Sequence, residues 1–381
     1  MKTMRKIFMS LPFFALGLVG CEERTPYTDT TKLWPAGGAD GKYGYIDQKG
    51  TMKIPAMYDY TTTFSCGYAL VQSGENLYFI DKKGNIQGGM SFDYANPFFN
   101  DYAVFELDGK YGLLNKKLEY QIQPIYSWLG DFRDGLAYAS MQGDKYGFVN
   151  KSGKYTINEI YKYAYDFIDG LAPVSNDGTK WGCVNSKGEY VVSPVYDAIY
   201  PYSSKMAPFE RDGKIGFLNT SGKEAVMPIY EDASHFFEND LAPVCLNGKY
   251  GYIDKKGNVK IATQYDYAFS FSEGYAIVAN YSQDGESATA MVIDTKGNVV
   301  FTLPKGFGPS EAGGYFHNGL LLIGGETDTN NKWEYRYIDT KGNLVYSWTE
   351  DYSSYYAPQK VSKNKDMKKV PTKHFSLGHK K

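Results

Sequence analysis

The chain has 381 residues, of which 43% are hydrophobic, 17% aromatic and 22% charged, and its formal net charge is −2. This balance excludes the strong basic footprint that is typical of a nucleic-acid-binding protein. The 36 Tyr and 41 Gly residues favour a β-rich repeat protein over a helical one.

A targeting segment opens the chain. Three basic residues precede an apolar run, Ile7 to Val19, which is shorter than the about 20 residues of a membrane span. The run ends at Leu18-Val19-Gly20-Cys21, which resembles the lipobox of bacterial lipoproteins. The resemblance implies that residues 1–20 are a signal peptide and that Cys21 carries the acyl chains of a membrane anchor.

Residues 21–39 are expected to be a tether, and a repeat array is expected from residue 40 to residue 350. Gly-Lys-Tyr-Gly-Tyr-Ile-Asp stands at both 41–47 and 248–254, with variants between. The aliphatic residue before the Asp or Asn recurs six times at steps of 34 or 35 residues, and then after 40 and 45. Such a fixed period indicates about eight or nine tandem units. These residues are Ile46, Ile80, Leu114, Val149, Val184, Leu218, Ile253, Ile293 and Ile338.

Each unit predicts three short antiparallel strands. The run 250–254 alternates as a strand does, and Asp254-x-x-Gly257 favours an Asx turn that ends in a left-handed glycine. A second strand follows, and after a loop of about ten residues a third strand returns through pairs such as Asp108-Gly109. Two details depart from regularity. Leu118 replaces the turn glycine of the third copy, so that turn should be different or strained. Pro173 and its equivalents have no backbone N–H to donate, so the nitrogen at this position must face away from any partner strand.

The string Lys180-Trp181-Gly182, Asn185-x-x-Gly188, Pro194-Val195-Tyr196 resembles the bacterial WG-containing repeat, over roughly residues 40 to 345. The resemblance implies an all-β, secreted or surface protein with no common enzymatic activity. Leu77-Tyr78, Ile215 and the copies after residue 280 depart from the pattern. One unit cannot bury its own apolar face, so neighbours must stack. A β-propeller-like arrangement is expected, with an open superhelical array as the alternative.

Candidate binding residues are those outside the repeat register. The recurring acids explain themselves as turn residues, so no catalytic residue, metal site or cofactor is predicted. Flat aromatic faces hold sugar rings and protein hot spots. Inserted loops, here 281–290, 302–318 and 324–334, carry function more often than the scaffold does. These two arguments select Trp34, Trp128, Tyr315, His317, Trp333 and Trp348.

The expected function is a membrane-anchored, non-catalytic binding or scaffold lipoprotein of the bacterial cell envelope, with a protein or glycan partner. The outer membrane is the expected location, with its periplasmic or surface face left open. Two alternatives stand: an envelope protein that only spaces a complex, and a carbohydrate-active or other hydrolase on a propeller-like fold. Residues 351–381 form a Lys-rich tail, expected to be solvated unless it contacts anionic glycan or lipid headgroups.

Overall fold

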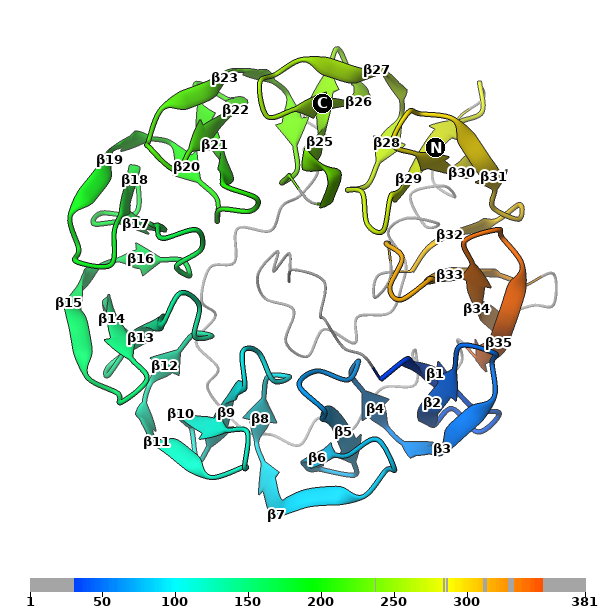
Figure 1. Ribbon diagram of the computed structural model, residues 1–381, viewed down its shortest axis with the longest axis horizontal. Helices are drawn as coiled ribbons and strands as arrows, with labels where there is room; N and C mark the ends of the chain where they lie inside the picture. Colours follow the sequence, from blue (N-terminus) through cyan, green and yellow to red (C-terminus); the bar gives the residue numbers. More distant parts are fainter. Residues whose placement is uncertain are drawn as a thin grey trace.

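The computed structural model describes residues 31–351 except 237, 284, 286, 311–313 and 328–331. These residues form nine antiparallel sheets that follow one another around a closed circle in chain order (Figure 1). The protein is therefore a nine-bladed β-propeller, and the open array is excluded. Blade 1 contains β1–β3, blade 2 contains β4–β7, and so on to blade 9, which contains β32–β35. The predicted signal peptide, Cys21 and residues 352–381 of the Lys-rich tail lie outside the described residues. Within those residues we find no helix with the length and hydropathy of a membrane span.

The strands fall into four layers from the centre outwards (Figure 1). The innermost strands are β4 (Tyr60–Thr61), β8 (Tyr94–Ala95), β12 (Trp128–Leu129), β16 (Tyr163–Ala164), β20 (Ala198–Ile199), β24 (Asp232–Ala233), β28 (Tyr267–Ala268) and β32 (Phe307–Pro309). The second layer is β1 (Leu33–Gly37), β5 (Ala69–Ser73), β9 (Tyr102–Leu107), β13 (Leu136–Ser140), β17 (Ala172–Ser175), β21 (Met206–Arg211), β25 (Leu241–Leu246), β29 (Tyr275–Tyr281) and β33 (Leu320–Glu326). The third is β2 (Tyr43–Asp47), β6 (Asn76–Ile80), β10 (Lys110–Asn115), β14 (Tyr146–Asn150), β18 (Trp181–Val184), β22 (Lys214–Asn219), β26 (Lys249–Asp254), β30 (Ala288–Asp294) and β34 (Lys332–Asp339). The outermost is β3 (Met52–Tyr58), β7 (Ile86–Phe92), β11 (Tyr120–Tyr126), β15 (Tyr155–Tyr161), β19 (Tyr190–Tyr196), β23 (Glu224–Tyr230), β27 (Val259–Tyr265), β31 (Val299–Thr302) and β35 (Leu344–Asp351). A 3-10 turn, η1 (Glu238–Asp240), precedes β25.

Two expectations need correction. Blades 2 to 9 have four strands rather than three, because the predicted loop contains an innermost strand of two or three residues. Such a strand is too short to show an alternating pattern. The array also begins before residue 40, since β1 lies within the stretch expected to be tether and pairs with β2.

The turn between the third and outermost strands is the predicted Asx turn. Asp254 Oδ1 accepts the backbone N–H groups of Lys256 (2.9 Å) and Asn258 (3.0 Å), and Gly257 has φ 81°. The third copy keeps this turn with Leu118 at φ 62°, so its turn is the strained form of the two expected. We call the end of the propeller that carries these turns the Asx face. The opposite end, which carries the hairpins between the second and third strands, is the hairpin face.

The glycine of the Trp-Gly or Tyr-Gly pair lies beneath a bulge of the outermost strand. A Cβ on Gly182 would stand 2.4 Å from the carbonyl oxygen of Val192, and the equivalent glycines meet the same backbone. The second copy has Tyr78 at this position. In this blade the outermost strand has one more residue than in the other blades between the two strand pairs that flank Tyr78. That longer stretch contains Gly88 (φ 74°) and Gly89 (φ 62°). Leu118 packs against Gly88, whose Cβ would lie 3.0 Å from its Cδ1. The departures at these positions therefore form one coupled change between blades 2 and 3.

Proline is tolerated in the second strand because the innermost strand has already ended beside it. The Pro173 carbonyl accepts the N–H of Tyr165 (2.9 Å), which follows β16 directly. At the equivalent position of blade 2, the Leu70 N–H has no strand partner on that side and donates to the Thr62 hydroxyl (3.0 Å). The predicted absence of a ladder partner is confirmed, although the strand is an inner one.

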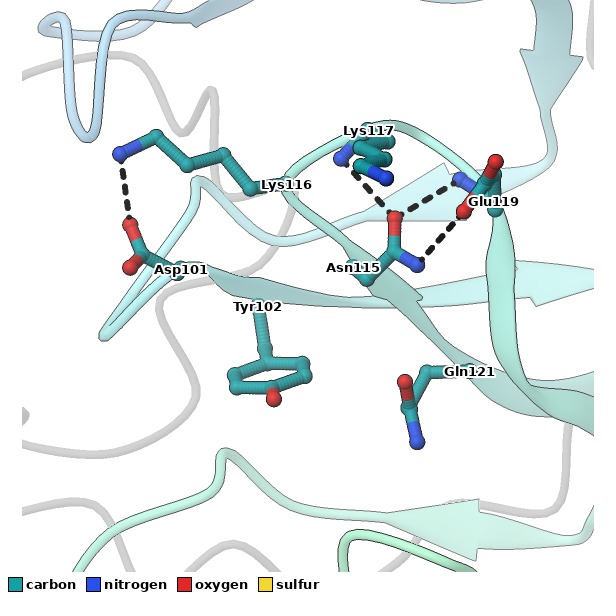
Figure 2. A pocket seen from close by; sticks show the side chains of 7 residues that line it. All are labelled: Asp101, Tyr102, Asn115, Lys116, Lys117, Glu119 and Gln121. Atoms are coloured by element: carbon teal, nitrogen blue, oxygen red, sulfur yellow. Dashed lines mark hydrogen bonds and ion pairs between the residues drawn. The ribbon is translucent and has the colours of Figure 1, made fainter.

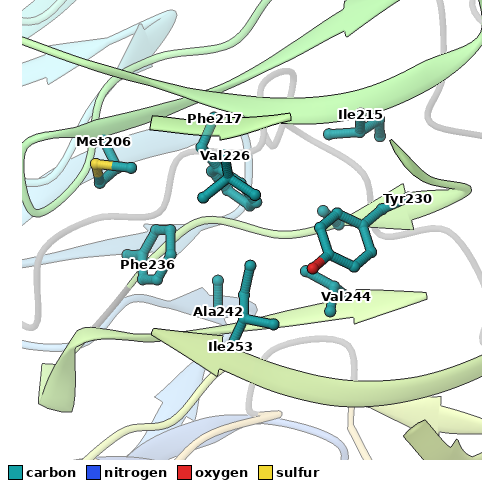
Figure 3. Packing of buried hydrophobic residues seen from close by; sticks show 10 residues of the cluster. Met206, Ile215, Phe217, Val226, Tyr230, Phe236, Ala242, Val244 and Ile253 are labelled. Atoms are coloured by element: carbon teal, nitrogen blue, oxygen red, sulfur yellow. The ribbon is translucent and has the colours of Figure 1, made fainter. Parts of the chain in front are cut away.

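The hydrophobic core lies between blades. Figure 3 shows one such layer, in which Phe217 and Val226 of blade 6 face Phe236 and Ile253 of blade 7. The described residues contain nine such clusters, one for each pair of neighbouring blades. The ninth joins blade 9 to blade 1, where the hydroxyls of Tyr337 and Tyr346 donate to the carbonyls of Pro35 (2.9 Å) and Gly37 (3.0 Å). Side-chain packing therefore closes the circle, because no strand is exchanged between these two blades.

Candidate functional site

Three of the predicted binding tryptophans are buried rather than exposed. Trp34, Trp333 and Trp348 have exposed fractions of 2%, 6% and 8%. Trp34 and Trp348 belong to the cluster that closes the propeller, and Trp348 stacks on Tyr335 with ring centroids 5.0 Å apart. Their position outside the repeat register reflects the junction of the first and last blades. Sequence could not separate this cause from surface exposure.

The other predicted residues have different environments. Tyr315 is 55% exposed, and His317 is half-buried in the tight turn that leads to β33. The His317 carbonyl accepts the indole N–H of Trp34 (2.9 Å), so the His317 backbone also helps to hold blade 9 against blade 1. Trp128 is half-buried at the start of β12. A ligand at any of these residues stays a prediction.

Trp128 belongs to a set of aromatic side chains in three adjacent blades that we call the aromatic arc. Ring centroids are 5.4 Å apart for Tyr111 and Trp128, 6.3 Å for Trp128 and Tyr138, and 5.9 Å for Tyr138 and Tyr146. Gly130 makes room for this packing, because a Cβ there would lie 2.2 Å from the Tyr138 ring. The complete arc is Tyr111, Trp128, Tyr138, Tyr146, Tyr163, Tyr165 and Trp181, in blades 3 to 5.

A second group of rings in the arc lies in blade 5, where Trp181 stacks on Tyr165 (5.1 Å, 21°) and on Tyr163 (6.2 Å, 14°). Most of its rings stand at strand ends near the hairpin face; Tyr165, on the inner loop, is 37% exposed and the others are half-buried. In blade 6, Tyr200 matches Tyr165, but Ala198 and Ile215 replace Tyr163 and Trp181, so the stacked rings stop there. Polar groups border it, including the ammonium of Lys162, 5.7 Å from the Tyr163 ring centroid.

A buried ion pair, which the sequence analysis missed, lies on the inner loops of blades 4 and 5. Arg133 Nε is 3.5 Å from Asp166 Oδ2, with side-chain exposures of 6% and 11%. The guanidinium stands 4.4 Å from the Phe99 ring centroid, and Asn96 donates to nearby Asp131 (2.9 Å). The sequence does carry a sign of this pair. An acid, Asp131 or Asp166, stands directly before the recurring aromatic residue, where other copies carry Thr63 or Pro97. Because it is buried between blades, we assign the pair to blade packing.

A recess of about 300 Å³ opens on the Asx face of blade 3 (Figure 2). Its volume is at the lower end for ligand sites. Its polar groups largely satisfy one another: Lys116 pairs with Asp101 (2.9 Å), and Asn115 donates to Glu119 (3.1 Å). The Lys151 ammonium covers the Tyr102 ring at 4.2 Å. The recess therefore offers less free aromatic surface than the arc. Its lining is Asp101, Tyr102, Asn115, Lys116, Lys117, Glu119 and Gln121.

Shifted pKa values belong to structural positions. The Thr51 N–H lowers the pKa of Asp47, and the Asn298 side chain lowers that of Asp294, each within its Asx turn. Burial raises the pKa of the Cys183 thiol to about 12 and that of Cys245 to about 11, so both are poor nucleophiles at neutral pH. No three His, Cys, Asp or Glu side chains converge as a metal site within the part of the chain that the structure describes.

Comparisons with known proteins agree with this architecture. The fold is similar to a crystal structure of the eukaryotic initiation factor, with a TM-score of 0.59, 10% identity, and coverage of 84% of this chain and 96% of that one. The BamB protein from Moraxella catarrhalis gives a TM-score of 0.39 at 11% identity, over 66% of this chain and 86% of that one. At these identities the first similarity concerns the fold alone. No curated protein matches the chain in sequence.

The model of the WG containing repeat family matches seven segments: residues 43–76, 79–111, 111–146, 146–179, 181–214, 215–250 and 250–280. Together the segments cover more than half of the chain, and they run from β2 of blade 1 into β29 of blade 8. The chain belongs to the WG containing repeat family.

Proposed function

We propose that the chain is a lipid-anchored, non-catalytic binding protein of the bacterial cell envelope, and that the aromatic arc is the surface that meets a protein or glycan partner. The observation that carries the proposal is the arc itself. It spans three adjacent blades, keeps part of its ring surface in solvent, and ends where blade 6 has Ala198 and Ile215. Aromatic faces bordered by polar groups suit both sugar rings and protein side chains.

A non-catalytic role is supported by where the titratable groups lie. The acids with lowered pKa, such as Asp47 and Asp294, recur in register and accept backbone N–H bonds in turns. The off-register acid Asp166 pairs with Arg133 between blades. A catalytic carboxylate would instead need a reacting atom within hydrogen-bond reach.

The arc is tested with a matched pair of double variants on a glycan microarray. Tyr163→Leu with Trp181→Leu removes two stacked rings of the arc and keeps apolar volume. Tyr267→Leu with Tyr250→Leu makes the same change at the equivalent positions of blades 8 and 7. Since each aromatic stack contributes about 0.5–1.5 kcal/mol, the arc variant should bind about tenfold more weakly, and the control should bind normally.

A protein partner is tested in the same way, with a photo-crosslinking residue at position 165 or at position 281 in intact cells. A crosslink from position 165 only, lost in the arc variant, supports a protein ligand. Equal glycan binding and equal crosslinking by both double variants would refute the arc as the contact surface.

Anchoring and location need separate measurements. Mass spectrometry of the N-terminal peptide should find Cys21 acylated. Protease treatment of intact and lysed cells, with a periplasmic marker, tells which side of the membrane the propeller faces. An unmodified N-terminus would refute the lipid anchor and leave the arc untouched.

A further inference from the structure

The two faces of the propeller differ in how their lysines are arranged. On the Asx face, every blade carries an exposed lysine in or next to its Asx turn. Seven stand two residues after the Asx residue. In the other two blades, which have Ser152 and Ser221 there, the lysine stands two residues later. The nine are Lys49, Lys83, Lys117, Lys154, Lys187, Lys223, Lys256, Lys296 and Lys341.

These nine lysines form no ion pair with any residue that the structure describes. No carboxylate of the described residues lies within ion-pair distance of any of them. Other lysines of the Asx face do pair with its acids, as Lys116 does with Asp101 (2.9 Å) and Lys260 with Asp254 (3.2 Å). The hairpin face has paired lysines as well, such as Lys180 with Asp197 (2.6 Å). The positive charge of the Asx face is therefore available to an external anion.

Blades 3 to 6 lack the acid that starts the turn in the other blades, although Glu119 and Glu189 follow Lys117 and Lys187 and accept from Asn115 (3.1 Å) and Asn185 (2.8 Å). There the turn begins with neutral Asn (Asn115, Asn150, Asn185 and Asn219), whereas the other five turns begin with Asp. Two further acids, in the tight turns that lead to β13 and β17, keep their charge but are held by backbone hydrogen bonds. Asp134 and Asp169 accept the N–H groups of Gly170 and Lys205, each at 2.7 Å. We call Lys117, Lys154, Lys187 and Lys223 the basic arc.

The chain also enters the propeller on this face. Leu33, the first residue of β1, lies opposite Asp47, which starts the Asx turn of blade 1. Cys21 is twelve residues earlier, and an extended chain of that length reaches at most about 40 Å. A lipid on Cys21 therefore holds Leu33, at the blade 1 edge of the Asx face, within that distance of the bilayer.

We propose that the Asx face docks on anionic phospholipid headgroups of the membrane that carries the anchor, with the basic arc as its main contact. This orientation rests on the proposed lipid anchor. It turns the hairpin face, near which most of the aromatic arc lies, away from the bilayer and toward a partner. Near an anionic surface each lysine strengthens attachment about fivefold, so four lysines together contribute several hundredfold.

The test maps lysine accessibility on the full, lipidated chain in vesicles of phosphatidylcholine alone or of equal parts phosphatidylcholine and phosphatidylglycerol. An amine-acetylating reagent that cannot cross membranes is added, and the modified lysines are identified by mass spectrometry. We expect the basic arc to be protected only with phosphatidylglycerol. Lys110, Lys145, Lys162 and Lys180, which are exposed on the hairpin face, should react in both vesicles. Protection should disappear at about 1 M salt, where the screening length is about 3 Å.

Two variants complete the experiment. Changing the four lysines of the basic arc to Gln should abolish the protection of Lys83 and Lys256, and the same change at the four hairpin-face lysines should not. Equal reactivity of both faces on phosphatidylglycerol vesicles overturns the proposal. So does protection by a soluble anionic polysaccharide in the absence of protection by vesicles. If the chain fails to attach to neutral vesicles, the anchor is absent, and added phosphatidylglycerol vesicles still report on the face.

Discussion

The glycine of the repeat motif allows a quantitative prediction about the fold. In Gly182→Ala the new Cβ would lie 2.4 Å from Val192 O, 2.9 Å from Pro194 N and 3.0 Å from Ser193 C. All three are backbone atoms, so the bulge must move by about 1 Å to restore an ordinary contact. Overpacking of this kind costs up to about 3 kcal/mol. Alanine returns about 0.5–1 kcal/mol by restricting the unfolded chain. The net loss is about 2 kcal/mol, or roughly 3 °C in Tm for a protein of this size.

The control is Gly213→Ala, which places a Cβ in open space at φ 71°. It incurs only the left-handed backbone strain, about 1 kcal/mol. Thermal and urea unfolding are followed by fluorescence, and the native-state emission of Trp181 should change only in Gly182→Ala. If Gly182→Ala is no more destabilising than Gly213→Ala and leaves the emission unchanged, the close approach of the bulge is not what requires glycine.

Three further predictions follow from packing and titration. Leu118→Gly removes the strain of a left-handed leucine but also removes a side chain that is only 6% exposed. The lost packing costs about 2–5 kcal/mol of unfolding free energy, more than the strain, so Tm should fall, and a higher Tm would contradict this. Trp348→Ala should cost about 3–5 kcal/mol and make the junction of blades 9 and 1 the first site of limited proteolysis; cleavage elsewhere first would argue against it. The pKa of Asp294 is lowered by folding, so its contribution is present above the unfolded pKa of about 3.9 and is lost as the pH falls through the folded pKa. Asp294→Asn keeps the turn, because four other copies begin it with Asn. Its Tm should therefore fall by less than that of the unchanged protein between about pH 5 and pH 3; an equal fall would mean that other groups cause the acid sensitivity.

The sequence predicted the repeats, the Asx turns and the proline positions because each depends on residues close together in the chain. An Asp and a glycine three residues apart define a turn wherever it lies, and a period of 34 or 35 residues implies stacked units. These features reappear in the structure at the predicted residues. The same reasoning recognised Leu118 and Tyr78 as departures from the pattern. It could not show that both belong to one interface, where Gly88 makes room for Leu118.

Only the tertiary structure decided how the units are joined. The innermost strands have two or three residues, too few for a periodic signal, and their pairing creates the fourth strand of blades 2 to 9. Closure depends on contacts such as that of Tyr337 with Pro35, which are about 300 residues apart. Trp34 and Trp348 seemed suited to the surface because their repeat positions are unusual, yet they fill that junction. Local pattern thus determined the unit, and long-range packing determined the number of blades, the closed circle and the two unlike faces.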